Sequence, residues 1–176
     1  MLEGTSQIED LLSCERLQGV ACGWVAGEEI PQPYRQLLCH ERDMTSTLAA
    51  FHGGEVGLRV FHSKKDGDRY VREVLLSVDE KPVEYGVIVI HLENFPPELR
   101  ERILGEGEPL GGILNSSGLA YQSSPRGMLE FPQAEFIDDI FPSAGGGSLY
   151  GRYNALFDST GNILARILEI LPRENP

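Results

Sequence analysis

The sequence predicts one α+β domain built on an antiparallel sheet. Its 176 residues, 41% of them hydrophobic, suffice for one buried core and are too few for two ordinary domains. Strand patterns follow one another as hairpins and meanders, and the short helical patterns between them lack the regular alternation of βαβ units. We therefore expect a single domain over residues 1–176, with no internal repeat.

Helices are predicted where apolar residues recur at helical spacing between capping and breaking residues. They cover residues 8–12, 34–39, 44–52 and 98–104, and residues 109–114 form a tight turn or a helix start. The third helix is the best defined, because Asp43 can cap its first turn and Gly53 can end it. The fourth begins after Pro97 and ends at Gly105.

Strands are predicted where β-branched and other apolar residues alternate or run together between turn residues. They cover residues 56–61, 70–78, 83–92, 119–122, 127–131, 149–157 and 163–171. Short turns rich in Lys, Asp, Gly and Pro separate the first three, which predicts an antiparallel meander. The last two are joined by the turn over residues 158–162 and form a further hairpin.

Charge and hydropathy exclude several classes of function. A net charge of −12 and a pI near 4.7 would repel phosphate backbones, so nucleic acid is not an expected partner. The longest apolar runs are well short of the roughly 20 residues that cross a bilayer. The first residues have neither the basic start nor the apolar segment of a targeting peptide. We expect a cytoplasmic monomer without membrane contact.

The residues that commonly bind metals and cofactors show no organised pattern. The three cysteines, Cys14, Cys22 and Cys39, lack Cys-x-x-Cys spacing, which argues against both a disulfide framework and a zinc site. The four histidines lie in separate predicted elements, and the glycine runs lack the spacing of nucleotide-binding loops. We therefore predict no metal and no cofactor.

Three charged residues stand in apolar strand patterns: Arg72, Arg152 and Glu169. A buried guanidinium is costly unless a carboxylate meets its forked donors, and that carboxylate can belong to the protein or to a ligand. An acidic protein that binds a small anion needs such a cationic site. The alternative is an ion pair between Arg72 and Glu169 that has only a structural role.

Five motifs occur along the chain in the order of the chorismate lyase family. They are Glu41-Arg42-Asp43-Met44-Thr45, Arg69-Tyr70-Val71-Arg72-Glu73-Val74-Leu75-Leu76, Glu108-Pro109-Leu110-Gly111, Leu149-Tyr150-Gly151-Arg152 and Glu169-Ile170-Leu171-Pro172. The chain resembles this family over about residues 37–172. Residues 40–48 and 82–86 are more closely similar to the divergent chorismate lyase-like branch found in cyanobacteria and archaea. Residues 1–36 are then an N-terminal extension that packs on the domain.

The resemblance implies a six-stranded antiparallel sheet with short helices as flaps over a buried ligand. It also implies a cofactor-free lyase that converts chorismate to 4-hydroxybenzoate and pyruvate for the biosynthesis of a quinone such as ubiquinone or plastoquinone. By motif, Arg72 would clamp the ring carboxylate with the backbone amide of Leu110, Met44 would border the hydroxyl end, and Glu169 would hydrogen-bond the hydroxyl. Arg72 and Glu169 would be the catalytic residues. Arg152 is a further candidate, from its charge alone, for the carboxylate of the leaving enolpyruvyl group.

The chain departs from the family pattern at two positions. Glu169 lies three residues before Pro172 rather than four, which would reverse its face unless a bulge near the preceding turn compensates. Gly112 replaces the arginine that commonly follows Pro-Leu-Gly.

Two alternative functions remain open. The first is a non-catalytic domain that binds aromatic carboxylates, as regulatory sensor domains of a similar fold do. A structural protein without a ligand is the second.

Overall fold

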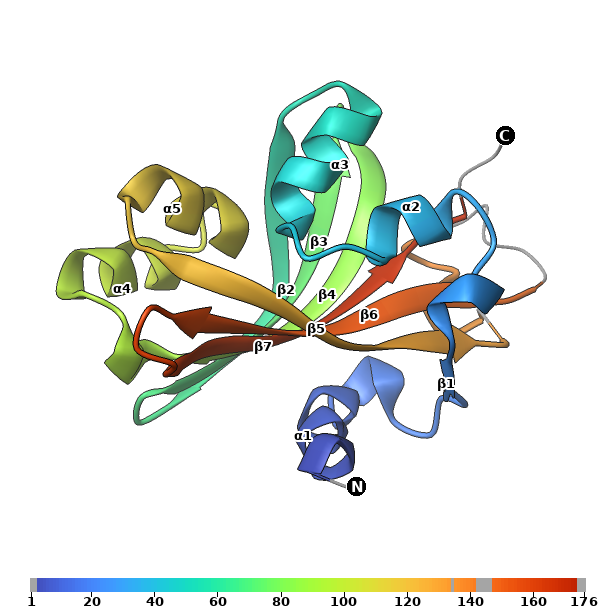
Figure 1. The fold of residues 1–176 in the computed structure, drawn as a ribbon, viewed down its shortest axis with the longest axis horizontal. Helices are drawn as coiled ribbons and strands as arrows, with labels where there is room; N and C mark the ends of the chain where they lie inside the picture. Colours follow the sequence, from blue (N-terminus) through green and yellow to red (C-terminus); the bar gives the residue numbers. More distant parts are fainter. Residues whose placement is uncertain (1–2, 134, 142–146, 174–176) are drawn as a thin grey trace.

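The structure, a computed structural model, describes residues 3–133, 135–141 and 147–173. Its helices and strands follow the order of the chain (Figure 1). They are α1 (Glu3–Leu12), η1 (Glu15–Leu17), β1 (Gly23–Val25), η2 (Gly27–Glu29), α2 (Tyr34–Leu38), α3 (Met44–His52), β2 (Val56–Asp66), β3 (Arg69–Val78), β4 (Lys81–His91), η3 (Leu92–Asn94), α4 (Pro97–Leu104), α5 (Leu110–Ser117), β5 (Tyr121–Phe131), η4 (Glu135–Ile137), β6 (Leu149–Asp158) and β7 (Ile163–Leu171).

The described residues form seven strands of one antiparallel sheet, in the order β1-β5-β6-β7-β4-β3-β2. The α+β class and the antiparallel sheet are confirmed, but the expected count of six strands is wrong. The additional strand is β1, which pairs with β5 over only three residues. Strands predicted at 119–122 and 127–131 are one strand, β5, because a register shift between Pro125 and Gly127 takes up the proline without ending the pairing.

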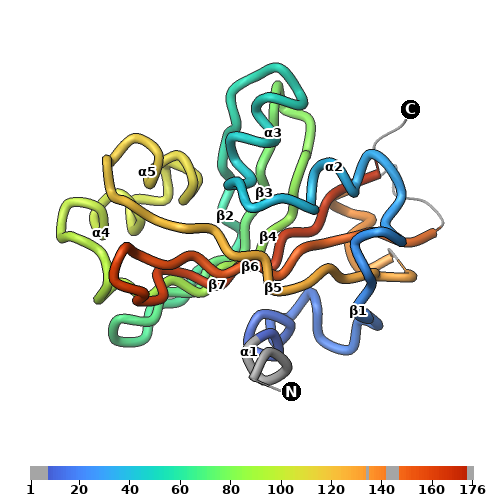
Figure 2. The backbone as a smooth tube through the Cα atoms, in the orientation of Figure 1, coloured from blue at the N-terminus to red at the C-terminus, as the bar shows by residue number. Residues whose placement is uncertain are grey.

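The helices divide between the two faces of the twisted sheet. Figure 1 shows α3 and α5 on one face and α1 on the other. The backbone trace in Figure 2 places α4 and α5 together at one end of the sheet, with α3 beside α5. None of the helices in the described part of the chain is long and apolar enough to span a bilayer. Helices α3 and α5 lie where flaps over a pocket were expected, and they contact each other.

Each face of the sheet has its own apolar core. Alternate residues of β4 show this division, since Tyr85 and Val87 belong to the cluster on the α1 face while Ile88 and Ile90 belong to the cluster on the other face. Leu11 of α1 is fully buried in the first cluster. The face that carries α3 and α5 also carries buried polar residues, and it is there that a site can form.

Helix α3 ends where capping chemistry predicts. The Asp43 side chain accepts a hydrogen bond from the Ser46 backbone N–H at 2.8 Å, and Gly53 adopts a left-handed conformation with φ of 73°. Met44 is therefore fixed as the first helical residue. The segment beginning at Leu110, which the sequence left as a turn or a helix start, is a helix of eight residues.

Candidate functional site

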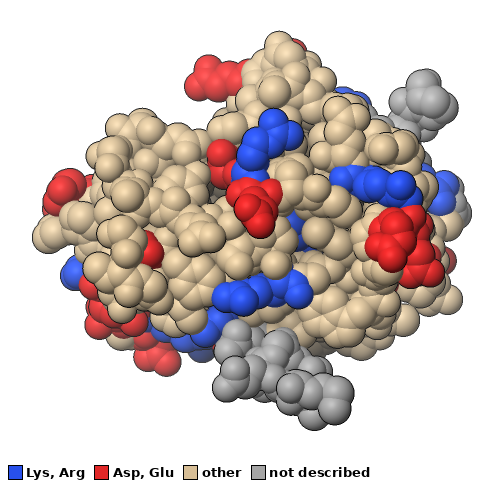
Figure 3. Space-filling model, in the orientation of Figure 1, with Lys and Arg blue, Asp and Glu red and all other residues tan. Residues whose placement is uncertain are grey.

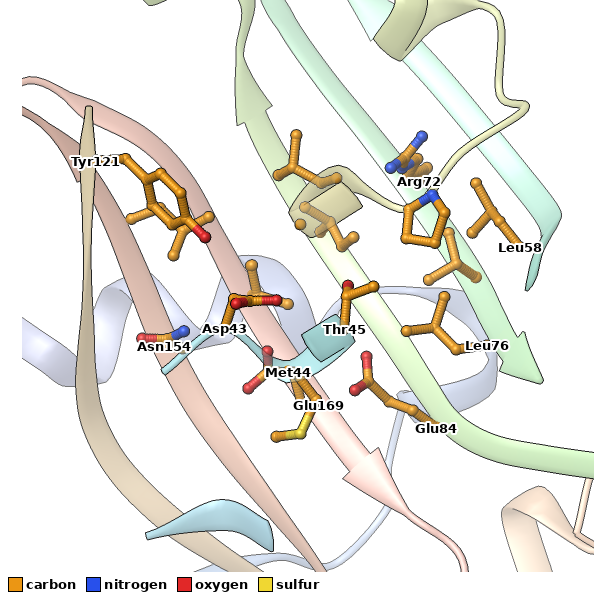
Figure 4. Close-up of a pocket in the computed structure, with 17 residues that line it drawn as sticks. Asp43, Met44, Thr45, Leu58, Arg72, Leu76, Glu84, Tyr121, Asn154 and Glu169 are labelled. Atoms are coloured by element: carbon orange, nitrogen blue, oxygen red, sulfur yellow. The ribbon is translucent and has the colours of Figure 1, made fainter. Parts of the chain in front are cut away.

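A cavity lies between the sheet and the helices α3 and α5 (Figure 4). It encloses about 490 Å³ of space, including its opening. Its walls combine apolar side chains with a few polar ones. They are Asp43, Met44, Thr45, Leu58, Arg72, Val74, Leu76, Glu84, Ile88, Pro109, Leu110, Gly111, Tyr121, Asn154, Leu156, Ile167 and Glu169. A narrow apolar cavity with a few convergent polar groups is typical of a small-molecule site.

Arg72 supplies the positive charge of the cavity. It lies in the middle of β3, opposite Ile88 of β4, and none of its surface is exposed to solvent. Its Nη1 donates a hydrogen bond to the Ile103 carbonyl at 3.5 Å, whereas its Nε and Nη2 have no partner among the described residues. Burial lowers the pKa of Arg72, and the nearby Tyr70 and Glu106 oppose this effect only in part. The guanidinium is thus buried, charged and largely unpaired.

Helices α3 and α5 bring backbone groups to the same cavity. Met44 and Leu110 are the first residues of these two helices, and both line the cavity. The helices can approach closely because residue 111 is glycine: a Cβ atom there would lie 2.6 Å from Oγ1 of Thr45 and 3.1 Å from Oδ1 of Asp43. The backbone N–H groups in the first turn of a helix lack intrahelical acceptors and favour anions.

Glu169 is paired with Arg152, not with Arg72. Arg152 of β6 and Glu169 of β7 lie directly opposite each other, and Nε of Arg152 donates to Oε2 of Glu169 at 2.6 Å. Arg152 also donates to the carbonyls of His40 at 2.9 Å and Arg42 at 3.4 Å. The alternative of a structural Arg72–Glu169 ion pair is therefore wrong.

Arg152 holds the segment that leads into α3. Burial alone would lower the pKa of Arg152, but the Glu169 carboxylate and, more weakly, Glu84 outweigh this and raise it. The two carbonyls it binds belong to the turn immediately before the α3 cap, Asp43. Arg152 does not line the cavity, and its guanidinium already has partners within the protein.

Glu84 is a cavity residue that the sequence did not single out. It lies on β4, is 3% exposed, and its Oε2 has no hydrogen-bond partner among the described residues. Burial raises the pKa of Glu84 well above its usual range, and the charge of Glu169 raises it further, while Arg152 opposes the shift. The signal was a lone glutamate within an apolar strand, inside the stretch 82–86 that supported the resemblance.

Four of the five predicted binding residues meet in this cavity: Met44, Arg72, Leu110 and Glu169. Figure 4 shows Arg72 at one end and the carboxyl groups of Glu84 and Glu169 at the other. Glu169 reaches this face although it stands one residue closer to the terminal proline than the family pattern. The β6–β7 pairing contains a register shift beside the turn, between Leu156 and Phe157, where a compensating bulge was expected.

Comparison with known proteins gives the fold a context. No protein-family model matches the chain, and no curated protein matches it. Among solved structures, the effector domain of PhnF from Mycobacterium smegmatis matches with a TM-score of 0.55 and 12% identity over 74% of this chain and 88% of that one. PhnF itself matches with a TM-score of 0.55 and 13% identity over 95% and 93% of the two chains. The chain has the fold of a regulator's effector domain.

A further match agrees with this assignment of the fold. The possible transcriptional regulator YydK from Bacillus subtilis subsp. subtilis str. 168 has a TM-score of 0.51 and 8% identity over 69% of this chain and 59% of that one. Effector domains of such regulators have a fold related to that of chorismate lyases, so the expected fold is supported at this coarser level. At these identities the likeness concerns the fold alone.

The two ends of the cavity offer different chemistry. At one end, the free donors of Arg72 can receive a carboxylate in a bidentate arrangement. At the other end, Glu84 and Glu169 can exchange hydrogen bonds with a hydroxyl group or accept a proton. Glu169 and Arg72 lie two strands apart and two residues out of register, which separates their Cα atoms by roughly 12 Å. The apolar walls between these ends suit a ring.

Proposed function

We propose that this cavity binds a small aromatic carboxylate, with the carboxylate held by Arg72. The observation that carries the proposal is the state of Arg72: fully buried, with Nε and Nη2 unpaired, at the end of a cavity with apolar walls. An unpaired buried charge is costly, and a ligand carboxylate would remove that cost by accepting both hydrogen bonds. The backbone amide of Leu110 can add a third donor.

Binding of this kind fits the chain's fold. The PhnF domain with which this chain shares its fold is named an effector domain, and small-molecule sites are typically narrow apolar cavities with a few polar groups. Met44 and Leu110, the first residues of α3 and α5, form part of the wall that a ligand in the cavity would contact. A ligand is thus expected to couple to the position of these helices.

The experiment is a calorimetric titration of 4-hydroxybenzoate into the wild-type protein and two variants. Arg72→Met should weaken binding at least about 30-fold, since loss of one partner of a buried charge pair costs about 2 kcal/mol or more. Arg126→Met is the matched control, because Arg126 is exposed on β5 and stacks on Phe157. Equal affinity in the wild type and Arg72→Met would contradict the proposed clamp.

A second candidate function is turnover of chorismate, as a chorismate pyruvate-lyase that serves quinone biosynthesis. The observation that favours it is a pair of buried carboxyl groups, Glu84 and Glu169, opposite the carboxylate clamp. In this reaction the enolpyruvyl ether leaves C3 of the ring, C4 loses a proton, and the ring becomes aromatic. Glu169 would accept or relay that proton, and orientation would supply the rest of the catalysis without a cofactor.

In this second function, Arg152 could bind a ligand only by giving up hydrogen bonds that it already makes within the protein. For it to receive the enolpyruvyl carboxylate, it would have to exchange its hydrogen bonds to Glu169 and the His40 carbonyl. The protein should be incubated with chorismate while pyruvate and 4-hydroxybenzoate are followed by chromatography. Formation of both products supports the lyase. Tight 4-hydroxybenzoate binding without product formation supports the binding domain.

A further inference from the structure

Glu84 is the least satisfied polar group at the far end of the cavity from Arg72. Its side chain is enclosed, and Oε2 has no partner among the described residues. Room for it comes from residue 86, since a Cβ there would lie 3.3 Å from Oε1 of Glu84 and 3.1 Å from Cγ2 of Val74. The glycine on the same face of β4 therefore leaves space for a carboxyl group and little more.

Glu84 shares this end with one carboxylate that is already paired. Oε2 of Glu169 accepts from Arg152 at 2.6 Å, whereas Arg152 makes no hydrogen bond to Glu84 among the described contacts. One guanidinium cannot neutralise two adjacent carboxylates in a buried site, so one carboxyl keeps its proton. Arg152 pairs with Glu169 and leaves Oε2 of Glu84 without a partner among the described residues, so Glu84 is the member that keeps its proton. The raised pKa of Glu84, caused by burial and then by the charge of Glu169, agrees with this assignment.

We propose that Glu84, as a carboxylic acid, determines ligand specificity by hydrogen bonding to the hydroxyl group of an aromatic carboxylate whose other end is held by Arg72. The proposal rests on the proposed function of the cavity. A carboxylic acid offers an O–H donor and a carbonyl acceptor, and a hydroxyl group is complementary to both. A ligand with a second carboxylate at that position would instead be repelled by the negative charge of Glu169.

The ligand class that follows is a ring with a carboxylate and, on the opposite side, a hydroxyl group. Figure 4 shows the carboxyl groups of Glu84 and Glu169 turned toward the same part of the cavity, away from Arg72. Glu84 pairs with Leu76, which lies four residues along β3 from Arg72. The Cα atoms of Glu84 and Arg72 are then roughly 14 Å apart, so their side chains can approach the two ends of one ring.

The test is a comparison of three ligands, 4-hydroxybenzoate, benzoate and benzene-1,4-dicarboxylate, by calorimetry. The wild type should prefer 4-hydroxybenzoate to benzoate by about tenfold and should reject the dicarboxylate. Glu84→Gln keeps a donor and an acceptor and should retain most of the preference. Glu84→Leu should bind 4-hydroxybenzoate and benzoate equally. Glu101→Leu, on the exposed side of α4, is the control and should behave as the wild type.

The outcomes distinguish failure of this inference from failure of the proposed function. Wild-type protein that binds none of the three ligands overturns the proposed function and this inference with it. Binding with an unchanged preference in Glu84→Leu overturns the inference alone. If Glu84→Leu does not fold, the infrared difference spectrum between the wild type and Glu84→Gln at neutral pH decides. It should contain the carbonyl band of a protonated carboxyl group, and a carboxylate band in its place overturns the inference.

Discussion

Arg72 is held in β3 at a cost to the stability of the empty protein. Its guanidinium is fully buried and makes one long hydrogen bond, to the Ile103 carbonyl at 3.5 Å. Replacing buried ionic groups with apolar side chains of similar volume is often stabilising by 1–4 kcal/mol. A residue that lowers stability while facing a cavity is typical of a functional site.

Arg72→Met is therefore expected to raise the free energy of unfolding by about 1–4 kcal/mol. Urea denaturation without ligand measures this change, with Arg126→Met as the exposed control. The gain should disappear when both proteins are compared with saturating 4-hydroxybenzoate, because the ligand stabilises only the protein that binds it. A loss of stability in the ligand-free Arg72→Met protein would mean that the guanidinium has a structural partner.

Replacing Arg152 is expected to lower the free energy of unfolding, the opposite of the effect of replacing Arg72. Arg152→Met leaves Glu169 buried without its ion pair and frees the carbonyls of His40 and Arg42. Breaking a buried pair from one side costs about 3–5 kcal/mol of unfolding free energy. The double variant Arg152→Met, Glu169→Leu should recover part of that loss, as a double-mutant cycle by urea denaturation can measure. A loss in the double variant equal to the sum of the losses in Arg152→Met and Glu169→Leu would refute the coupling.

At the scale of single residues, the sequence predicted which charged side chains are buried in the sheet better than it predicted their partners. Arg72 and Glu169 stood out because a charge in an apolar strand needs an explanation. The arginine that pairs with Glu169 is determined by the register in which β6 pairs with β7. The sequence of one strand does not contain that register. Glu84 escaped notice because the apolar run after it accounted for the whole strand.

At the scale of elements, we expect the contact between α3 and α5 to control the opening of the cavity. Gly111→Ala would place a methyl group 2.6 Å from Oγ1 and 3.0 Å from Cβ of Thr45, so the two helices would have to separate. Overpacking of this kind costs about 1–3 kcal/mol. We expect lower stability and faster dissociation of a bound aromatic carboxylate.

Gly112→Ala is the matched control for this prediction. A Cβ atom at residue 112 would meet only Cδ of Pro109, at 4.0 Å. Alanine is favoured over glycine inside a helix by about 0.5–1 kcal/mol, so this variant should be slightly more stable than the wild type. Thermal unfolding and stopped-flow ligand release measure both variants. Similar behaviour of the two variants would show that the helix contact does not control the opening.

The elements were predicted best where local chemistry decides them. Helix α3 has the predicted bounds because its cap, Asp43, and its stop, Gly53, act within a few residues. Strand β1 was missed since three residues give no periodicity, and only pairing with β5 makes them a strand. Strand β5 was divided in two because Pro125 usually interrupts a strand, whereas here the bulge beside it keeps the pairing.

At the scale of the whole molecule, the sheet separates an apolar face from the face that carries the candidate site. Leu11, Tyr85 and Phe131 are fully buried in an apolar cluster on the α1 face, where the one buried charge among the described residues, Glu73, is paired with Arg16. The buried charges Arg72, Arg152 and Glu169 occur on the other face. In Figure 3, Lys and Arg form separate small groups among Asp and Glu groups on the surface viewed. The buried charges beside the cavity are thus enclosed within the protein, whereas the charges on the surface viewed are dispersed.

The same internal charges link global stability to pH. The pKa of Glu84 is raised in the folded protein, by burial first and then by Glu169, from an ordinary value of 4.5. Above pH 4.5 the unfolded chain releases the proton of the Glu84 carboxyl group, whereas the folded protein keeps it. The contribution of Glu84 to stability is thus complete below pH 4.5 and is lost as the pH rises toward the folded pKa.

Glu84→Gln removes this titration and leaves the other groups in place. The free energy of unfolding of the variant relative to the wild type should therefore increase by about 1.4 kcal/mol for each pH unit above 4.5, until the folded pKa of Glu84 is reached. Urea denaturation at a series of pH values from acid to mildly alkaline measures the difference. Titrations of Asp, Glu and His elsewhere in the molecule cancel between the two proteins. A difference that does not change with pH would mean that Glu84 is ionised in the folded protein, and its role as the hydrogen-bond donor would then be lost.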